Sequence, residues 1–496
     1  MSFFQQMEME NNMTTGWNGE GGHRSTLSAN LDFHTRIGNM RYAQPEEIVG
    51  LFAEAFHEDE RLALRNLFYS RDILKGMGEK RVFEEIVIAI AQNAPNVFSQ
   101  MVPLIPEYGS FADLRKIIGS TNLDYEDVIP ALDFLKEQIV KDYDSAYPSL
   151  CAKWMPTAER KNELHKVGVR RFCKRVGINK ADYRKTISII RKRLGIIETK
   201  MTEGRYEDID YSKIPSQAFK KYTQAFYRND EERFEAFLQR ANEGAVKVNA
   251  GTLQAHQLVS KYLNSVLYQE DQAIEAQWKN LPKPDLETMP NVLTMVDVSG
   301  SMYGQPMEVA VSLGIYISEN MQGEFKNKFL TFSENTELIS FDTEKTLYDK
   351  VGTMSRASWG FNTNLARAFR LVLNTAVNNN LSQEEMPQVL MVLSDMQMDE
   401  ASEEGRTFFE KMKRVYENHG YDMPFIVWWN ISNDWDTAFP TTKFTKNAAM
   451  VSGFSQQVFS ALFKMDLDEL KNFTPEKAML NILNSERYDK VDSIKL

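Results

Sequence analysis

The chain has 496 residues, of which 43% are apolar and 11% aromatic, enough to fill the cores of two or three domains. Its formal charge of −11 argues against a uniformly basic protein that coats nucleic acid. The two cysteines, Cys151 and Cys173, form neither a disulfide framework nor a CxxC metal pair, which indicates a reducing compartment. The start lacks a signal-peptide pattern, and no apolar run approaches the roughly 18 residues of a membrane span, so we expect a cytoplasmic protein that does not engage a membrane.

Residues 1–30 are rich in Asn, Gly, Gln and Met without a sustained period, which predicts a flexible N-terminal arm. From 31 to 280 apolar residues recur at helical spacing, and Pro or Gly interrupts the pattern every twenty residues or so. Short helices in antiparallel succession predict an all-α domain of HEAT-like, solenoid-like repeats.

The pattern changes at residues 281–290, where three prolines predict a linker. Residues 291–465 then alternate between short apolar runs and helical segments, which predicts a doubly wound, mostly parallel α/β sheet with helices on both faces. Two strands are too close for a crossover helix, so we expect one antiparallel edge strand. Residues 466–496 are typical of a helical C-terminal extension. The expected strands are 291–299, 326–333, 337–341, 388–395, 424–431 and 448–454, with helices near 306–321, 363–380, 401–418 and 455–471.

Oxygen-bearing side chains follow the first and fourth expected strands. In the doubly wound order 3-2-1-4-5-6 the strand order reverses between these two, and ligands bind outside the carboxyl ends at that point. Asp297 and Asp395 stand at those ends, Ser299 and Ser301 follow at alternating positions, and Thr363 offers a further hydroxyl. Hard oxygen ligands without a nearby His or Cys favour Mg²⁺, or another hard cation such as Mn²⁺ or Ca²⁺. The alternative is that these residues only cap helices and strand ends.

In type and order, Asp297-x-Ser299-x-Ser301, Thr363 and Asp395 resemble the metal-ion-dependent adhesion site (MIDAS) of von Willebrand factor type A domains. The resemblance implies that a carboxylate from a partner protein completes the coordination of the cation. It therefore implies recognition rather than catalysis, and we expect a protein that is not an enzyme.

The strings LFYSRDILKGMGEKRVF (67–83), IPEYGSFADL (105–114) and YRKTISIIRKRLGIIETKM (183–201) resemble a plant, fungal and viral family that is itself similar to the TROVE module of the Ro ribonucleoprotein autoantigen. The resemblance covers about residues 40–465. It implies a ring of helices closed by a von Willebrand A domain, with a positively charged ring that binds the ends of structured RNA. The strongest matches either touch RNA or brace helices, and they are Arg71, Asp72, Gly76, Gly78, Glu79 and Arg81.

Residues 151–200 hold 15 Lys and Arg against 4 Asp and Glu, and two helices there keep their basic residues away from an apolar stripe. Such a surface can neutralise phosphates, whereas the alternative is a pair of solvated helices whose charges meet the acidic remainder. Without an RNP or KH signature, recognition would be of backbone, ends or shape. The candidate RNA contacts are Lys166, Arg170, Arg171, Lys174, Arg175, Lys185, Lys192 and Arg193.

Together these patterns favour a non-catalytic, Ro-like RNA-binding scaffold with a Mg²⁺-dependent adhesion site. One alternative is a metal-dependent protein–protein adaptor that does not bind RNA. Another is a metal-dependent nuclease, since Asp395, Asp399 and Glu400 cluster near the expected cation, although two-metal hydrolysis needs bridging carboxylates rather than serine hydroxyls.

Overall fold

The computed structural model describes residues 3–15, 21–264, 269–285, 289–332, 336–341, 346–356, 364–397, 408–432, 434, 436–463 and 472–496. It has a helical first half and a second half built on a six-stranded sheet, so the predicted fold class is confirmed. No helix among these residues is long and apolar enough to cross a membrane.

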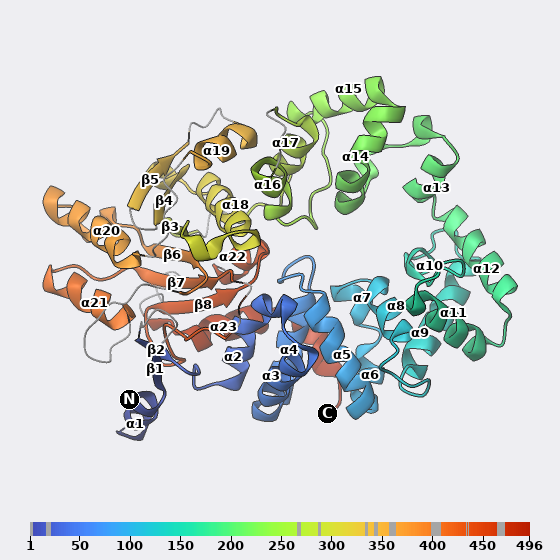
Figure 1. The fold of residues 1–496 in the computed structure, drawn as a ribbon, viewed down its shortest axis with the longest axis horizontal. Coiled ribbons are helices and arrows are strands. Elements are labelled where there is room, and N and C mark those ends of the chain that lie inside the picture. The colour runs from blue at the N-terminus through green and yellow to red at the C-terminus, as the bar shows by residue number, and fades with distance from the viewer. Residues whose placement is uncertain are drawn as a thin grey trace.

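The helices of the first half follow one another along an arc (Figure 1). The arc begins at α2, which packs on strand β8 of the sheet, and ends at α16, which packs on α18 and α19 of the second half. The two halves therefore close a ring, as the resemblance to Ro-type proteins implies. The helices are α1 (Phe3–Asn11), α2 (Ala29–Arg36), α3 (Pro45–Glu58), α4 (Glu60–Arg71), α5 (Arg81–Asn93), α6 (Pro95–Met101), α7 (Ile105–Tyr108), α8 (Phe111–Gly119), α9 (Ile129–Asp144), α10 (Cys151–Trp154), α11 (Glu163–Val176), α12 (Lys180–Arg193), α13 (Ile197–Thr202), α14 (Ser216–Asn229), α15 (Glu231–Asn242), α16 (His256–Leu263) and α17 (Gln272–Lys279).

The sheet has the strand order β5-β4-β3-β6-β7-β8, which is the doubly wound order that the sequence predicts. Only the pairing of β4 with β5 at one edge is antiparallel, and the other neighbours are parallel. The strands are β3 (Val292–Asp297), β4 (Lys328–Phe332), β5 (Thr336–Ser340), β6 (Val389–Ser394), β7 (Phe425–Asn430) and β8 (Ala448–Ser452), and the helices around them are α18 (Gln305–Glu319), α19 (Leu347–Met354), α20 (Leu365–Asn379), α21 (Phe408–Asn418), α22 (Gln457–Leu462) and α23 (Pro475–Leu483).

Helices cover both faces of the sheet, because successive side chains of a strand point to opposite faces. On β7 the ring of Trp428 packs against Phe408 of α21. The adjacent Trp429 is in register, across β6, with Val296 of β3. Val296 lies so close to Gly314 of α18 that a Cβ there would be 2.7 Å from its Cγ2. Thus α18 and α21 lie on opposite faces, and both strands are buried as their apolar runs predict.

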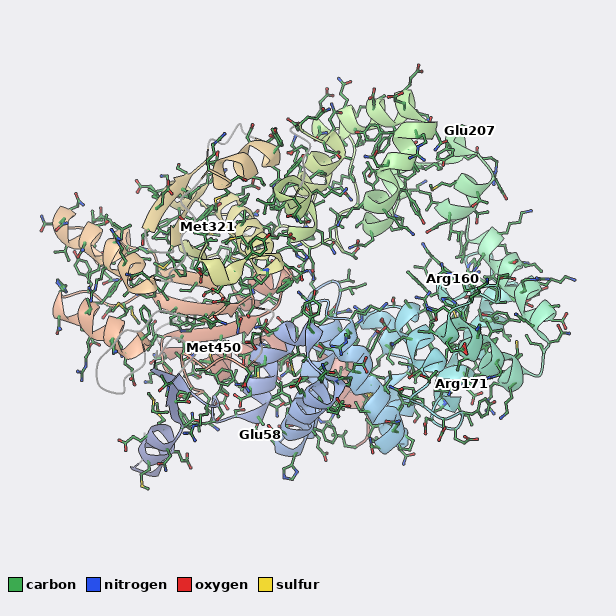
Figure 2. All side chains as sticks on the ribbon, in the orientation of Figure 1. Glu58, Arg160, Arg171, Glu207, Met321 and Met450 are labelled. Carbon is green, nitrogen blue, oxygen red and sulfur yellow. The ribbon has the colours of Figure 1, made fainter. Side chains whose placement is uncertain are left out.

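The prediction of a flexible N-terminal arm is wrong for residues 21–30, which pack against other parts of the protein. His23 and Phe439 exchange two backbone hydrogen bonds of 2.9 Å, so this segment, whose β2 (Gly21–His23) pairs with β1 (Met13–Thr15), joins the sheet half. Glu58 at the end of α3 (Figure 2) accepts hydrogen bonds from the backbone of Ala29 and Asn30. The polar composition of the segment concealed this packing, because its contacts are made by backbone and polar groups rather than by an apolar stripe.

The described part of the predicted linker is also packed. Leu281 is buried in the core, and the hydroxyl of Tyr316 donates a hydrogen bond to the carbonyl oxygen of Pro282. The first prolines of this stretch therefore mark a tight connection between the halves.

The predicted C-terminal extension crosses from the sheet to the helical half. Helix α23 packs on β8, α2 and α4, and the following 3₁₀ helix, Glu486–Ser493, packs on α4. The Arg487 guanidinium donates hydrogen bonds of 2.8 and 3.1 Å to the two oxygens of Asp72, whose side chain is fully buried. The last residues thus clamp the two halves together.

The motif that resembles Ro-type proteins braces this junction. Arg71 makes two hydrogen bonds, of 3.0 and 3.2 Å, with the buried Asp113 of α8. Glu79 is paired with Arg41, whose guanidinium carbon lies 3.4 Å from the ring centroid of Phe454 in the sheet half. The contacts in the structure are therefore those of bracing residues.

Replacing Arg487 with Ala leaves the Asp72 carboxylate buried without its cation, and we expect the free energy of unfolding to fall by about 3 kcal/mol. Urea denaturation followed by tryptophan fluorescence measures the change. The matched control is Lys490→Ala, which removes an exposed pairing with Glu107 and should cost less than about 1 kcal/mol. Equal losses in the two variants would contradict the bracing role of the buried pair.

Candidate metal centre

Asp297 and Asp395 meet at one edge of the sheet because β3 and β6 are parallel neighbours. Asp297 is the last residue of β3, and Asp395 directly follows β6. Both side chains are almost fully buried, with 0% of Asp297 and 2% of Asp395 exposed. The reversal of strand order therefore places the two acids together, as the sequence pattern predicts.

Hydrogen bonds from the flanking chain orient both carboxylates. Asp297 accepts from the backbone N–H of Ser299 at 2.9 Å through Oδ1, and from the Ser394 hydroxyl at 2.7 Å through Oδ2. Asp395 accepts from the backbone N–H of Gln397 at 3.0 Å. Ser394 is a site residue that the motif does not include, although its place beside Asp395 at the end of β6 is a signal that could have indicated it.

The two serines of the motif connect the buried acids to the surface. Ser299 is buried and Ser301 is exposed, and their hydroxyl oxygens lie 3.1 Å apart. Ser301 and Asp395 also line the same cleft, and the Ser301 side chain lowers the pKa of Asp395. The structure thus brings together four of the five predicted metal ligands, whereas Thr363 lies outside the described residues, as do Asp399 and Glu400.

Both carboxylates have raised pKa values, chiefly because they are buried. Burial raises the pKa of Asp297 to about 7, and the negative charge of Asp395 adds to the rise. Burial likewise raises the pKa of Asp395. Neither acid has an ion pair with a Lys, Arg or His side chain among the residues that the structure describes. A bound divalent cation would replace this repulsion by attraction.

The donor set fits a hard divalent cation. It consists of carboxylate and hydroxyl oxygens only, which suits Mg²⁺ and also Mn²⁺ or Ca²⁺ better than zinc or copper. In the described parts of the chain no group of three or more His, Cys, Asp and Glu side chains could hold a metal, so the hydroxyls are necessary ligands at this site. Mg²⁺ usually keeps some waters, which leaves a position for an outside ligand.

A cleft of about 530 Å³ opens at Ser301 and Asp395. Part of its wall comes from the turn that leads into α3, whose Tyr42 hydroxyl donates a hydrogen bond of 3.3 Å to Gln305 of α18. The helical half therefore narrows the approach to the candidate metal centre, which the sequence patterns did not indicate. The other residues that line the cleft are Ala43, Gln44, Glu47, Tyr303, Pro306, Gln397, Ser432 and Asp434.

Two of the predicted RNA contacts brace neighbouring helices. Arg171 (Figure 2) donates hydrogen bonds of 3.1 and 2.7 Å to the carbonyl oxygens of Ile118 and Ser120 at the end of α8. Arg175 makes two hydrogen bonds, of 2.6 and 2.5 Å, with Asp133 of α9. The guanidinium groups of Arg171 and Arg175 are thus bound to other groups of the helical half.

The remaining predicted RNA contacts differ in how free their charges are. Three have a neighbour, since Lys166, Lys174 and Arg193 contact Glu163, Tyr125 and Tyr143 respectively. Three are exposed and make no side-chain hydrogen bond or ion pair within the described residues, namely Arg170, Lys185 and Lys192.

Comparisons with known proteins agree with a two-part chain. A domain of unknown function, DUF2828, matches residues 163–284, and another, DUF7788, matches residues 291–495. The uncharacterized protein L728 of Acanthamoeba polyphaga mimivirus is 31% identical over 509 residues, which cover 95% of this chain and 87% of that protein. The chain therefore belongs to the same family as this viral protein. The crystal structure of the Ro (RSR) protein of Deinococcus radiodurans aligns with 94% of this chain and 100% of that chain, at 13% identity and a TM-score of 0.37.

Adding millimolar Mg²⁺ to protein treated with EDTA should raise the midpoint of thermal unfolding, because a ligand that binds only the folded state stabilises it. The variant Asp297→Asn should lose this response, while in EDTA it should be at least as stable as the wild type, since one buried charge is gone. Differential scanning calorimetry at pH 8 measures both effects. Ser382→Ala, at an exposed turn that precedes the amino end of β6, is the control. An unchanged midpoint for the wild type with Mg²⁺, Mn²⁺ and Ca²⁺ alike would contradict a cation site.

Proposed function

We propose that the protein is a non-catalytic binding scaffold with a cation-dependent adhesion site. Asp297, Ser299, Ser301 and Asp395, together with Thr363, would hold Mg²⁺ or a similar hard cation. The observation that carries this proposal is the pair of buried carboxylates at an open cleft, with no cationic partner among the residues that the structure describes.

Each ligand has a distinct part in this function. The two carboxylates supply the charge that retains the cation, and Ser394 and the backbone N–H groups keep them aimed at it. The serine hydroxyls are neutral ligands, so the cation keeps its affinity for a further negatively charged oxygen. A carboxylate of a partner protein is the ligand that suits this position.

The shape of the cleft restricts the partner. Tyr42 and Glu47 of the helical half stand beside the opening, so a partner that reaches the cation would pass these two side chains. The partner carboxylate is therefore expected on a protruding loop or a chain end. This arrangement favours a scaffold or adaptor over a nuclease, which would need a second cation bridged by carboxylates.

Capture of protein partners from the native cell should depend on both the cation and Asp297. We expect the immobilised wild type to retain its partners in Mg²⁺ and to lose about tenfold or more of them in EDTA, as should Asp297→Ala in either condition. Quantitative mass spectrometry measures the captured proteins. The control variant, Arg170→Glu with Lys185→Glu, carries exposed substitutions away from the cleft and should capture the partners normally. Partners that are retained equally in EDTA would argue against an adhesion site.

We also propose that the basic helices bind RNA, as the resemblance to Ro-type proteins implies. The exposed and unpaired Arg170, Lys185 and Lys192 support this second activity, since phosphate contacts need charges that are not committed elsewhere. Recognition there would be of the sugar-phosphate backbone and of RNA ends.

The RNA affinity should fall steeply with added salt, and replacing Arg170, Lys185 and Lys192 with Gln should make that dependence shallower. Three lost phosphate contacts would reduce the slope of log K against log salt by about 2 for single-stranded RNA. Fluorescence anisotropy at four salt concentrations measures the slope. The matched control is Lys446→Gln with Lys477→Gln, two exposed lysines of the sheet half. Binding that is absent, or that does not respond to salt, would remove the RNA activity.

A further inference from the structure

A second cavity lies where the end of the helical arc meets the sheet half. Its volume is about 280 Å³, and its walls come from α17, the connection after it, the end of α18 and the start of α19. It is therefore built by both halves of the ring, away from the strand ends that hold Asp297 and Asp395. The residues that line it are Glu275, Trp278, Lys279, Leu281, Lys283, Tyr316, Glu319, Asn320, Lys326, Asn327, Thr346, Leu347 and Lys350.

The two glutamates of this cavity are already engaged. Glu275 accepts hydrogen bonds from the backbone N–H groups of Leu347 and Tyr348, at 2.8 and 3.1 Å, so it serves the first turn of α19. Glu319 accepts a hydrogen bond of 3.0 Å from the indole of Trp278 and forms an ion pair with the buried Lys350. Lys350 therefore compensates the charge of Glu319, whereas hydrogen bonds from neutral donors hold the Glu275 carboxylate in place.

The cavity consequently has an excess of positive charge. Lys279, Lys283 and Lys326 come from three separate segments and are exposed at its rim. Lys279 donates only to a backbone carbonyl oxygen, that of Asn242, at 3.2 Å. The side chains of Lys283 and Lys326 make no hydrogen bond or ion pair with any part of the chain that the structure describes. The four lysines that line the cavity outnumber its two glutamates, and this excess favours an anionic ligand.

A polar side chain in the wall adds a hydrogen-bonding group. Asn327 is only 5% exposed as a residue and lines the cavity, and within the described residues its side-chain amide makes no hydrogen bond. The amide atoms are not among the buried polar atoms that lack a partner, so they face the open space of the cavity and can contact a ligand there. The backbone of Asn327 is left-handed, with φ of 58°, a conformation that Asn and Gly adopt most readily.

We propose that this cavity binds a small phosphorylated anion that carries two or more phosphate groups. The rim lysines would neutralise the phosphates, and the amide of Asn327 would donate a hydrogen bond to a phosphate oxygen. The volume suits a compact polyphosphate or the phosphate end of a nucleotide or inositol phosphate better than a large organic molecule. A ligand bound there would join Lys279 and Lys283 of the helical side to Lys326 and Asn327 of the sheet half, and so stabilise the closed ring.

Isothermal titration calorimetry tests the proposal, with inorganic tripolyphosphate, ATP and inositol hexakisphosphate as separate probes. The titrations are carried out in EDTA, so that no cation at the candidate metal centre contributes to the binding. We expect at least one of the three to bind the full-length protein, and the double variant Lys283→Glu with Lys326→Glu to weaken that binding about tenfold or more. The probe that binds most tightly identifies the source of the phosphate groups. Lys446→Glu with Lys477→Glu makes the same change of charge on exposed lysines of the sheet half and should bind like the wild type.

Asn327→Gly separates recognition from folding, because glycine keeps the left-handed backbone and removes only the amide. We expect this variant to unfold at the same temperature as the wild type and to bind the preferred probe several-fold more weakly. No binding of any probe by the wild type, or equal binding by the charge-reversed pair and its control, would overturn the proposal. Binding of RNA alone, lost in the charge-reversed pair, would also overturn it and assign these lysines to a nucleic-acid surface.

Discussion

Two carboxylates that are buried side by side repel each other, and the topology of the sheet leaves them no way to separate. Asp297 and Asp395 end neighbouring parallel strands at the point where the strand order reverses. Burial raises the pKa of both, and the negative charge of Asp395 raises that of Asp297 further. A site that is unfavourable when empty becomes favourable when a divalent cation shares it. The surrounding serines add oxygen ligands without adding charge, and the open cleft leaves room for one more ligand.

The helical half is joined to the sheet half and also forms part of the wall of the cleft at that site. Closure of the ring places the start of α3 at the wall of the cleft. The C-terminal 3₁₀ helix, through Arg487 and Asp72, holds the helical half against the sheet half. The phosphate cavity lies at the opposite seam, between α17 and α19. The helical half thus lines the cleft beside the candidate metal centre, and both halves line the second cavity, where a bound anion would join them.

Much of this could be predicted from the sequence, for identifiable reasons. Apolar runs such as VLMVL fit strands that are buried on both faces, and their alternation with helices predicts a doubly wound sheet. In the common strand order of such sheets, Asp297 meets Asp395. The sequence gives the charge of an arginine, but it does not show whether another group of the folded protein already binds its guanidinium. The sequence pattern places Arg171 and Arg175 on the same basic side of the helix as Arg170. In the structure, however, Arg171 binds carbonyl oxygens at the end of α8, and Arg175 binds the carboxylate of Asp133. These two contacts join residues that are 53 and 42 positions apart in the chain. The packing of residues 21–30 and the wall of the cleft join residues that are much farther apart, such as His23 with Phe439 and Tyr42 with Ser301.

The most direct measurement is the anomalous scattering of crystals grown with Mn²⁺ in place of Mg²⁺. The account predicts one anomalous peak between Asp297 and Asp395, within bonding distance of at least one serine oxygen of the motif, with a coordination position open to the cleft. Crystals in which the two acids and the serines bond only to one another, without a peak and without an opening to solvent, would contradict it.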